Sequence, residues 1–378
     1  MRANTRRCPP SRCRSRALAG LGALLLAACG GEPATPAYHA DETPTSLSDW
    51  GQLSIEGGVL QLAEGVEPYA LATPLFSDYA GKLRTVWTPA GAARYEPEAV
   101  FDFPVGTVIT KTFYYPENVD GTVERVREEG APHLGLDLGE VRLVETRLLV
   151  RREAGWLALP YVWNTEETDA ILKPVGAAYR LAFAEDGAEP TEFAYLVPNR
   201  NQCAGCHAVN NTTRALSPIG PKARHLNRDL AYADGAANQL GRWVETGLLE
   251  DAPNARPRSA FWTDAAEPLE ARARAYLEIN CAHCHNPVGP ADTSGLYLDE
   301  GTPFSPAYGL CKLPIAAAQG TGGRKHDIVP GDPDASILHY RMASDNPAEM
   351  MPELGRSTVH AEGVALVRAW IAALDGAC

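Results

Sequence analysis

The sequence predicts an α+β multidomain protein, in which a β-rich N-terminal domain is followed by mainly α-helical domains. Between residues 46 and 200, runs of β-branched and aromatic residues are broken at short intervals by Gly and Pro. After residue 266, apolar residues recur at helical spacing near both ends of the segment. The 378 residues are 45% hydrophobic and 21% charged, which excludes a disordered chain and allows two or three domains with cores of their own.

The first 28 residues have the composition of a signal peptide. They contain six arginines and no acidic residue, and end in an apolar run that is too short to span a bilayer. Cys29 directly follows Leu26-Ala27-Ala28, which resembles the lipobox of bacterial lipoproteins. An ordinary signal peptide with an incidental cysteine is the alternative. We expect residues 1–28 to be removed, Cys29 to carry a lipid, and residues 29–45 to form a flexible tether.

The charge of the chain indicates its location and the kind of partner that it suits. The formal charge is −13, and loss of the six leader arginines makes the mature chain more acidic still. This balance excludes a nucleic-acid binder and suits a basic redox partner, or solubility alone. We expect an exported protein that faces the periplasm on a lipid anchor. Gly30 after the cysteine, in place of Asp, favours the outer membrane.

Two copies of a C-x-x-C-H motif account for four of the nine cysteines. Two thiols at this spacing lie on one side of a helical turn, where they can bond to the two vinyl groups of one haem, and the adjacent His can ligate the iron. The motif residues are Cys203, Cys206 and His207 in the first copy and Cys281, Cys284 and His285 in the second.

Zinc and thiol redox chemistry are the competing interpretations of these motifs. Paired C-x-x-C zinc sites are about 15–20 residues apart, and the separation in this chain is far longer. A thioredoxin-like motif needs a βαβ setting, and the sequence around neither copy has one. The motifs therefore predict two covalently bound haem c groups, with His207 and His285 as proximal iron ligands.

The remaining cysteines are assigned by elimination. Cys8 and Cys13 leave with the signal peptide, and Cys29 takes the lipid. This leaves Cys311 and Cys378, which can form a disulfide in an oxidising compartment.

Residues 46–200 are expected to form a sandwich or barrel-like domain. Strands are predicted over 108–115, 141–151 and 156–163, where β-branched and aromatic residues alternate or cluster. No pair of nucleophile and base, phosphate-binding loop or metal-ligand cluster stands out in this domain.

The rest of the chain divides into two haem segments of the cytochrome c type. The first, residues 201–265, is irregular, with a helix predicted over 236–247. The second, residues 266–378, has a helix that begins near Pro268 and leads into the second motif, and another over 362–374. The first and last helices of the cytochrome c fold cross beside the haem, and this segment supplies both.

The second iron ligand differs between the two motifs. Met351, in Met350-Met351-Pro352, offers a thioether to the second iron; Met350 and simple core packing are the alternatives. His225 is the nearest candidate for the first iron, against a solvated His, a distant ligand such as Met342, or an open site.

Four stretches of the chain resemble a family of bacterial diheme c-type cytochromes, which are often encoded beside a parallel β-helix repeat protein. The resemblance implies two haems and a periplasmic or outer-membrane-facing location, and supplies no substrate. We expect an electron carrier that acts between redox partner proteins. A diheme peroxidase-like enzyme with one open iron, and a docking module built on the β-rich domain, are the alternatives. The stretches are residues 74–84, 280–287, 327–333 and 351–356.

Overall fold

The structure, a computed structural model, describes residues 34–128, 130–315 and 317–378. The predicted signal peptide and the predicted lipidation site Cys29 lie outside the described residues. Residues 34–378 form one compact unit, and the domain boundaries predicted after residues 200 and 265 fall within it. In the part of the chain that is described, no helix is both long enough and apolar enough to cross a membrane.

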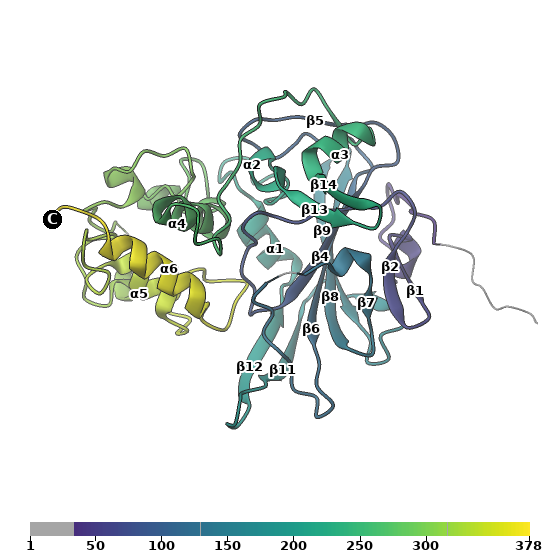
Figure 1. The fold of residues 1–378 in the computed structure, drawn as a ribbon, viewed down its shortest axis with the longest axis horizontal. Helices are drawn as coiled ribbons and strands as arrows, with labels where there is room; N and C mark the ends of the chain where they lie inside the picture. The colour runs from purple at the N-terminus through teal and green to yellow at the C-terminus, as the bar shows by residue number, and fades with distance from the viewer. Residues whose placement is uncertain (1–33, 129, 316) are drawn as a thin grey trace, which may run out of the picture. The chain divides into compact units, whose positions relative to one another are not determined.

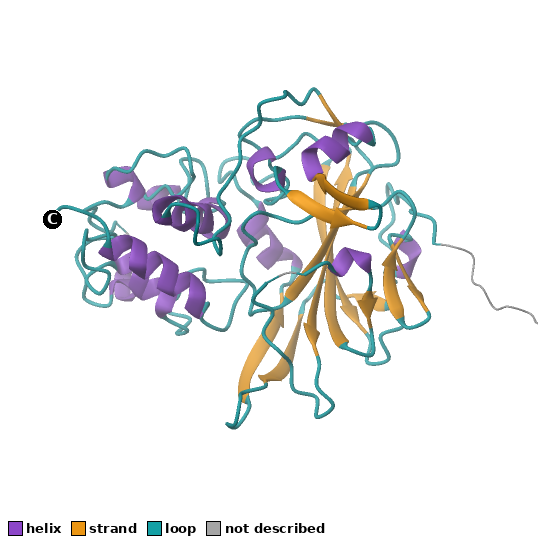
Figure 2. Cartoon of the chain, viewed as in Figure 1, coloured by secondary structure: helices purple, strands orange, loops and turns teal. Residues whose placement is uncertain are grey.

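Strands form most of the regular structure between residues 53 and 250 (Figures 1 and 2). They are β1 (Leu53–Glu56), β2 (Val59–Leu62), β3 (Glu67–Pro68), β4 (Gly81–Trp87), β5 (Ala93–Arg94), β6 (Val108–Pro116), β7 (Leu136–Asp137), β8 (Val141–Arg152), β9 (Gly155–Trp163), β10 (Ala170–Leu172), β11 (Ala177–Phe183), β12 (Thr191–Val197), β13 (Asp229–Tyr232), β14 (Gly235–Asn238) and β15 (Leu249–Glu250).

Six of these strands form an antiparallel sheet in the order β10-β9-β8-β6-β4-β3, which we call the main sheet. Side chains alternate between its two faces. Leu148 and Val150 face a core that includes Trp50 and the small sheet β1-β2-β7. Ile109 and Leu149 face a second core, which contains the helices that follow the first motif. The main sheet is therefore covered on both faces.

The helices are short and few, and the prediction of mainly α-helical domains of the cytochrome c type is wrong. Only 20% of the structure is helix, and strands and loops dominate (Figure 2). The α-helices in the described residues are α1 (Arg200–His207), α2 (Ala223–Leu226), α3 (Gln239–Glu245), α4 (Leu269–Leu277), α5 (Ile337–Ala343) and α6 (Ala361–Ala372).

The composition of the C-terminal part explains this correction. Between α4 and α5 the chain contains Gly and Pro at short intervals, and both residues disfavour helix interiors. The chain there forms the π-helical turn η3 (Glu278–Ala282), short 3-10 turns and loops. The helices predicted over 236–247 and 362–374 are present as α3 and α6, but they do not extend into a helical domain.

Helices α4 and α6 pack against each other near the second motif. Gly363 in α6 makes this possible, because a Cβ atom there would lie 2.3 Å from the ring of Tyr276 in α4. A disulfide joins Cys311 to Cys378 and connects the end of the chain to the loop after the second motif.

Two chain segments tie distant parts of the unit together. The described part of the predicted tether, residues 34–45, contacts the β-rich core: the Tyr161 hydroxyl donates to the Pro44 carbonyl at 2.7 Å. Asp78, before β4, accepts hydrogen bonds from the backbone of Ser357 and Thr358, before α6. Residues far apart in the sequence therefore surround the motifs.

Candidate functional site

The first C-x-x-C-H motif occupies helix α1. Asn199 caps the helix in a reciprocal capping box with Gln202, so the helix starts directly after β12 and places the motif beside the main sheet. The imidazole Nδ1 of His207 lies 2.8 Å from the Ser217 carbonyl, and this contact orients the ring. Cys203 is buried, and Cys206 is half-buried.

The second motif lies where α4 passes into η3 and a turn. Cys281 is in η3, and its carbonyl accepts hydrogen bonds from the backbone N–H groups of Cys284 and His285, which closes the turn. Nδ1 of His285 lies 3.4 Å from Oγ of Ser294. The motif is therefore held by backbone bonds, with its histidine turned toward the following loop.

The two motifs meet in the folded chain. The Cys284 thiol lies 3.6 Å from the carbonyl oxygen of Gly205, the middle residue of the first motif. Gly205 is also closely approached by Leu354, whose methyl group would lie 3.0 Å from a Cβ atom at that position. The sequence contains no local signal for this contact, because 79 residues separate its partners.

A first cavity lies between the main sheet and the first motif, with about 980 Å³ of empty space, open solvent included. Its walls are mostly aliphatic, from both the sheet and the loop around Ile219. Four basic side chains of the main sheet also line it, beside the thiols of the motif. They are Lys82, Arg84, Lys111 and Arg147.

A second cavity, with about 760 Å³ of empty space by the same measure, is lined by residues of both motifs. Met351 lines it, as does Met342, whereas Met350 is buried in the protein and is absent from the lining. His360 forms another wall: its ring stacks on Phe76 at a centroid distance of 4.2 Å. The structure therefore places the predicted ligand Met351 at the cavity that both motifs share.

Burial controls the protonation of the thiols and imidazoles. It raises the pKa of Cys203 and Cys206, and it raises the pKa of Cys281 and of Cys284 to about 12. The thiols are therefore protonated at neutral pH. Burial lowers the pKa of the motif histidines, to about 3 for His207 and about 4 for His285, so both are neutral.

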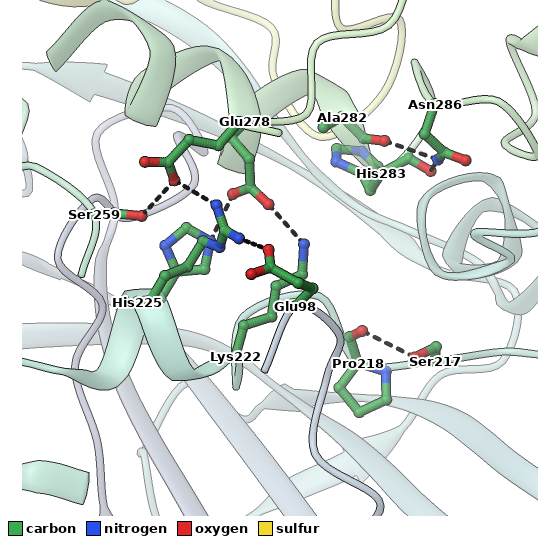
Figure 3. A network of polar contacts seen from close by, with 12 residues as sticks. Glu98, Ser217, Pro218, Lys222, His225, Ser259, Glu278, Ala282, His283 and Asn286 are labelled. Carbon is green, nitrogen blue, oxygen red and sulfur yellow. Dashed lines mark hydrogen bonds and ion pairs between the residues drawn. The ribbon is translucent and has the colours of Figure 1, made fainter. Parts of the chain in front are cut away.

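His225 lies in a buried polar network next to the second motif (Figure 3). Its Nε2 is 2.6 Å from a carboxylate oxygen of Glu278, whose other oxygen accepts a 2.6 Å hydrogen bond from Lys222. Burial alone would raise the pKa of Glu278, but the charges of His225 and Lys222 outweigh it and hold the pKa well below its ordinary value. His225 lines neither of the two cavities, and it is buried rather than solvated.

The prediction of two covalently bound haem c groups is contradicted. A metal ion needs several ligands that converge on one point, and the described residues contain no group of three or more His, Cys, Asp or Glu side chains that could hold one. Nδ1 of His207 contacts the Ser217 carbonyl, and Nδ1 of His285 contacts the Ser294 hydroxyl. The chemical groups that the motifs present are therefore their four free thiols and two imidazoles.

Several residues at the site were not anticipated from the sequence. The strand prediction over 141–151 assigned Val144, Thr146, Leu148 and Val150 to one face, and left the opposite face, which carries Arg147, without a role. Charged residues at alternate positions of an otherwise apolar strand were the available signal. His360 had no such signal, because its partners Phe76 and Tyr276 are remote in the sequence.

Comparison with known proteins adds no relative: no family model, no curated protein and no solved structure matches the chain.

Proposed function

We propose that the chain is an exported electron-transfer protein whose redox centre lies where the two C-x-x-C-H motifs meet. The observation that carries the proposal is the 3.6 Å contact between the Cys284 thiol and the Gly205 carbonyl. Electron exchange falls off steeply with distance, so two redox motifs of one chain can work together only when folding brings them side by side.

Burial makes the motif thiols slow to exchange with the thiols of other molecules. The thiolate is the reactive form of cysteine, and the raised pKa values of Cys281 and Cys284 keep these thiols protonated. The imidazoles of His207 and His285 are neutral, so the positive charge near the first motif comes from the basic side chains of the main sheet. The redox-active groups that the described residues supply are the cysteine pairs of the two motifs, in which oxidation of two thiols to a disulfide releases two electrons and two protons.

The acidic mature chain and the predicted lipid on Cys29 define the setting of this proposal. Opposite charge speeds the encounter of redox proteins, so an acidic carrier favours basic partner proteins in the periplasm. The lipid would keep the carrier at the membrane surface, with the outer membrane favoured by Gly30.

The test is a redox titration of the full chain, purified from a host that exports it. We expect a reversible transition in the wild-type protein. The transition should be altered in a Cys203→Ser/Cys206→Ser variant and in a Cys281→Ser/Cys284→Ser variant. The Cys311→Ser/Cys378→Ser variant separates the transition of the disulfide from that of the motifs, because it removes two sulfurs outside both cavities.

Intact mass, measured on the same samples, identifies what the four motif sulfurs carry. An unmodified chain, the loss of two hydrogens for each disulfide, and a covalent adduct give different masses. Absence of any reversible transition in the wild-type protein would refute the electron-transfer proposal, whatever the mass.

A further inference from the structure

Lys111 of β6 is a half-buried lysine with a basic residue on each neighbouring strand. In the strand register, Lys111 is opposite Arg84 of β4 and opposite Arg147 of β8. Burial disfavours the charged form of an amine, and like charges directly opposite each other disfavour it further. Burial, and then the charges of Arg147, Arg84 and Lys82, lower the pKa of Lys111 from 10.5 to about 7. About half of the Lys111 amines are therefore neutral at pH 7, against about one in 3,000 for a lysine with the ordinary pKa.

The carboxylate on the neighbouring strand is already paired with another residue. Glu145 accepts two hydrogen bonds from Arg147, at 2.8 and 2.5 Å, and a third from the Tyr195 hydroxyl at 2.7 Å. Its charge raises the pKa of Lys111, but by less than burial and the basic neighbours lower it. Within the described residues no carboxylate forms an ion pair with Lys111, whose Nζ lies 5.2 Å from the ring centroid of Phe113. A guanidinium does not lose its proton in a protein, so Arg147 stays charged and paired, and Lys111 becomes neutral instead.

Lys111 borders space that an apolar molecule can occupy. It lines both cavities, and the walls of the first are mostly aliphatic and come from segments that are distant in the sequence. A neutral lysine amine has a free electron pair, and an apolar pocket or a nearby cation is what makes lysine a nucleophile toward carbonyl compounds. The first cavity therefore combines a nucleophilic nitrogen with an apolar binding surface. The aliphatic side chains are Leu71, Leu75, Ile109, Leu149, Ile219 and Ile279.

We propose that Lys111 is a nucleophile that binds apolar aldehydes in the first cavity through a reversible imine. The amine nitrogen attacks the carbonyl carbon, the carbon–oxygen bond breaks, and the oxygen leaves as water with the two amine hydrogens. A carbon–nitrogen double bond then joins the ligand to Lys111, and hydrolysis reverses the reaction without an oxidant or a reductant. The apolar body of the ligand lies against the aliphatic walls, where its burial stabilises the complex. No motif sulfur takes part, so this inference is independent of the proposed electron transfer.

The test traps the imine by reduction and locates it by mass. The full-length protein is incubated at pH 7 with 2-naphthaldehyde and sodium cyanoborohydride, which reduces an imine to a stable secondary amine. Digestion with a protease that cleaves after glutamate, followed by peptide mass mapping, gives the rate of labelling at each lysine. The same experiment is done on the Lys111→Met and Lys173→Met variants. Lys173 is exposed and lines neither cavity, so its replacement is the matched control.

We expect Lys111 to be labelled at least about 10-fold faster than Lys173 in the wild-type protein, because a large neutral fraction at pH 7 outweighs the lower intrinsic reactivity of a less basic amine. 2-Naphthalenemethanol has the same apolar body and no carbonyl group, and it should slow labelling at Lys111 but not at Lys173. The Lys173→Met variant should keep the wild-type rate at Lys111. The Lys111→Met variant should lose the fast label and keep the slow labelling of Lys173.

The decisive comparison is made within the wild-type protein, so it does not depend on whether a variant folds. Labelling of Lys111 no faster than that of Lys173 would overturn the proposal. Labelling of Lys111 that the alcohol does not slow would also overturn it, because the aldehyde would then react without first occupying the cavity.

Discussion

Asp78 provides the sharpest test of how the C-terminal part is held against the β-rich part. Its side chain is only 4% exposed, and its Oδ1 accepts hydrogen bonds from the Ser357 N–H at 2.8 Å, the Thr358 N–H at 2.7 Å and the Thr358 hydroxyl at 2.8 Å. Asp78→Ala leaves two backbone donors without their acceptor, and each costs about 1–3 kcal/mol. The backbone φ of 46° adds a cost of about 1 kcal/mol, because Ala lacks the tolerance of Asp and Asn for this left-handed conformation.

Together these contributions predict a loss of about 3–7 kcal/mol in the free energy of unfolding for Asp78→Ala. The matched control is Asp78→Asn, which keeps both an acceptor oxygen and the tolerance for positive φ. Burial raises the pKa of Asp78, so the charged form is disfavoured in the folded state and loss of the charge is easily tolerated. We expect Asp78→Asn to stay within about 1.5 kcal/mol of wild type.

The assay is urea unfolding at pH 7, followed by tryptophan fluorescence and analysed by linear extrapolation. Limited proteolysis of the loop before α6 provides a second readout, because that loop contains both hydrogen-bond partners of Asp78. Equal stability of the Ala and Asn variants, or an Ala variant within about 1 kcal/mol of wild type, would show that these hydrogen bonds do not hold the loop.

Four further predictions concern the disulfide, Lys111, Glu278 and Cys29. Reduction of the Cys311–Cys378 disulfide, which spans 67 residues, should lower the free energy of unfolding by about 4 kcal/mol, and an unchanged urea midpoint under reductant would contradict this. The pKa of Lys111 is about 7 in the folded state, against an ordinary value of 10.5. Between these two pH values Lys111 is protonated in the unfolded state but not in the folded state. Lys111 therefore makes the free energy of unfolding rise with pH across this window. Lys111→Met should flatten this rise when unfolding free energies at pH 7 and pH 9 are compared. Glu278→Gln removes the carboxylate from the buried His225 and the half-buried Lys222 and should cost about 3–5 kcal/mol in urea unfolding, with a loss below about 1 kcal/mol arguing against the buried ion pair. Cys29→Ala should move the protein from the membrane to the soluble fraction, and retention on membranes would disprove the lipid anchor.

Local elements were predictable where the pattern of nearby residues determined them. The strands predicted over 108–115 and 141–151 are present as β6 and β8, because their β-branched and aromatic residues favour the extended backbone of a strand. Helix α6 is present where a helical apolar stripe was expected. The fold class was nevertheless wrong, because two good helices near the ends of a segment do not make the Gly- and Pro-rich chain between them helical.

The sequence by itself determined the composition of the site: two motifs at a set spacing, the histidine beside each, and two cysteines left over to pair. Only the tertiary structure decided which of these groups are neighbours. Three features of the site join residues that are remote in the chain or lie on different strands. They are the contact between Cys284 and Gly205, the row of basic side chains through Lys111, and the burial of His225 against Glu278. Local spacing specifies helices and strands through short-range sterics and hydrogen bonds, whereas these contacts depend on strand register and on the packing of many segments at once.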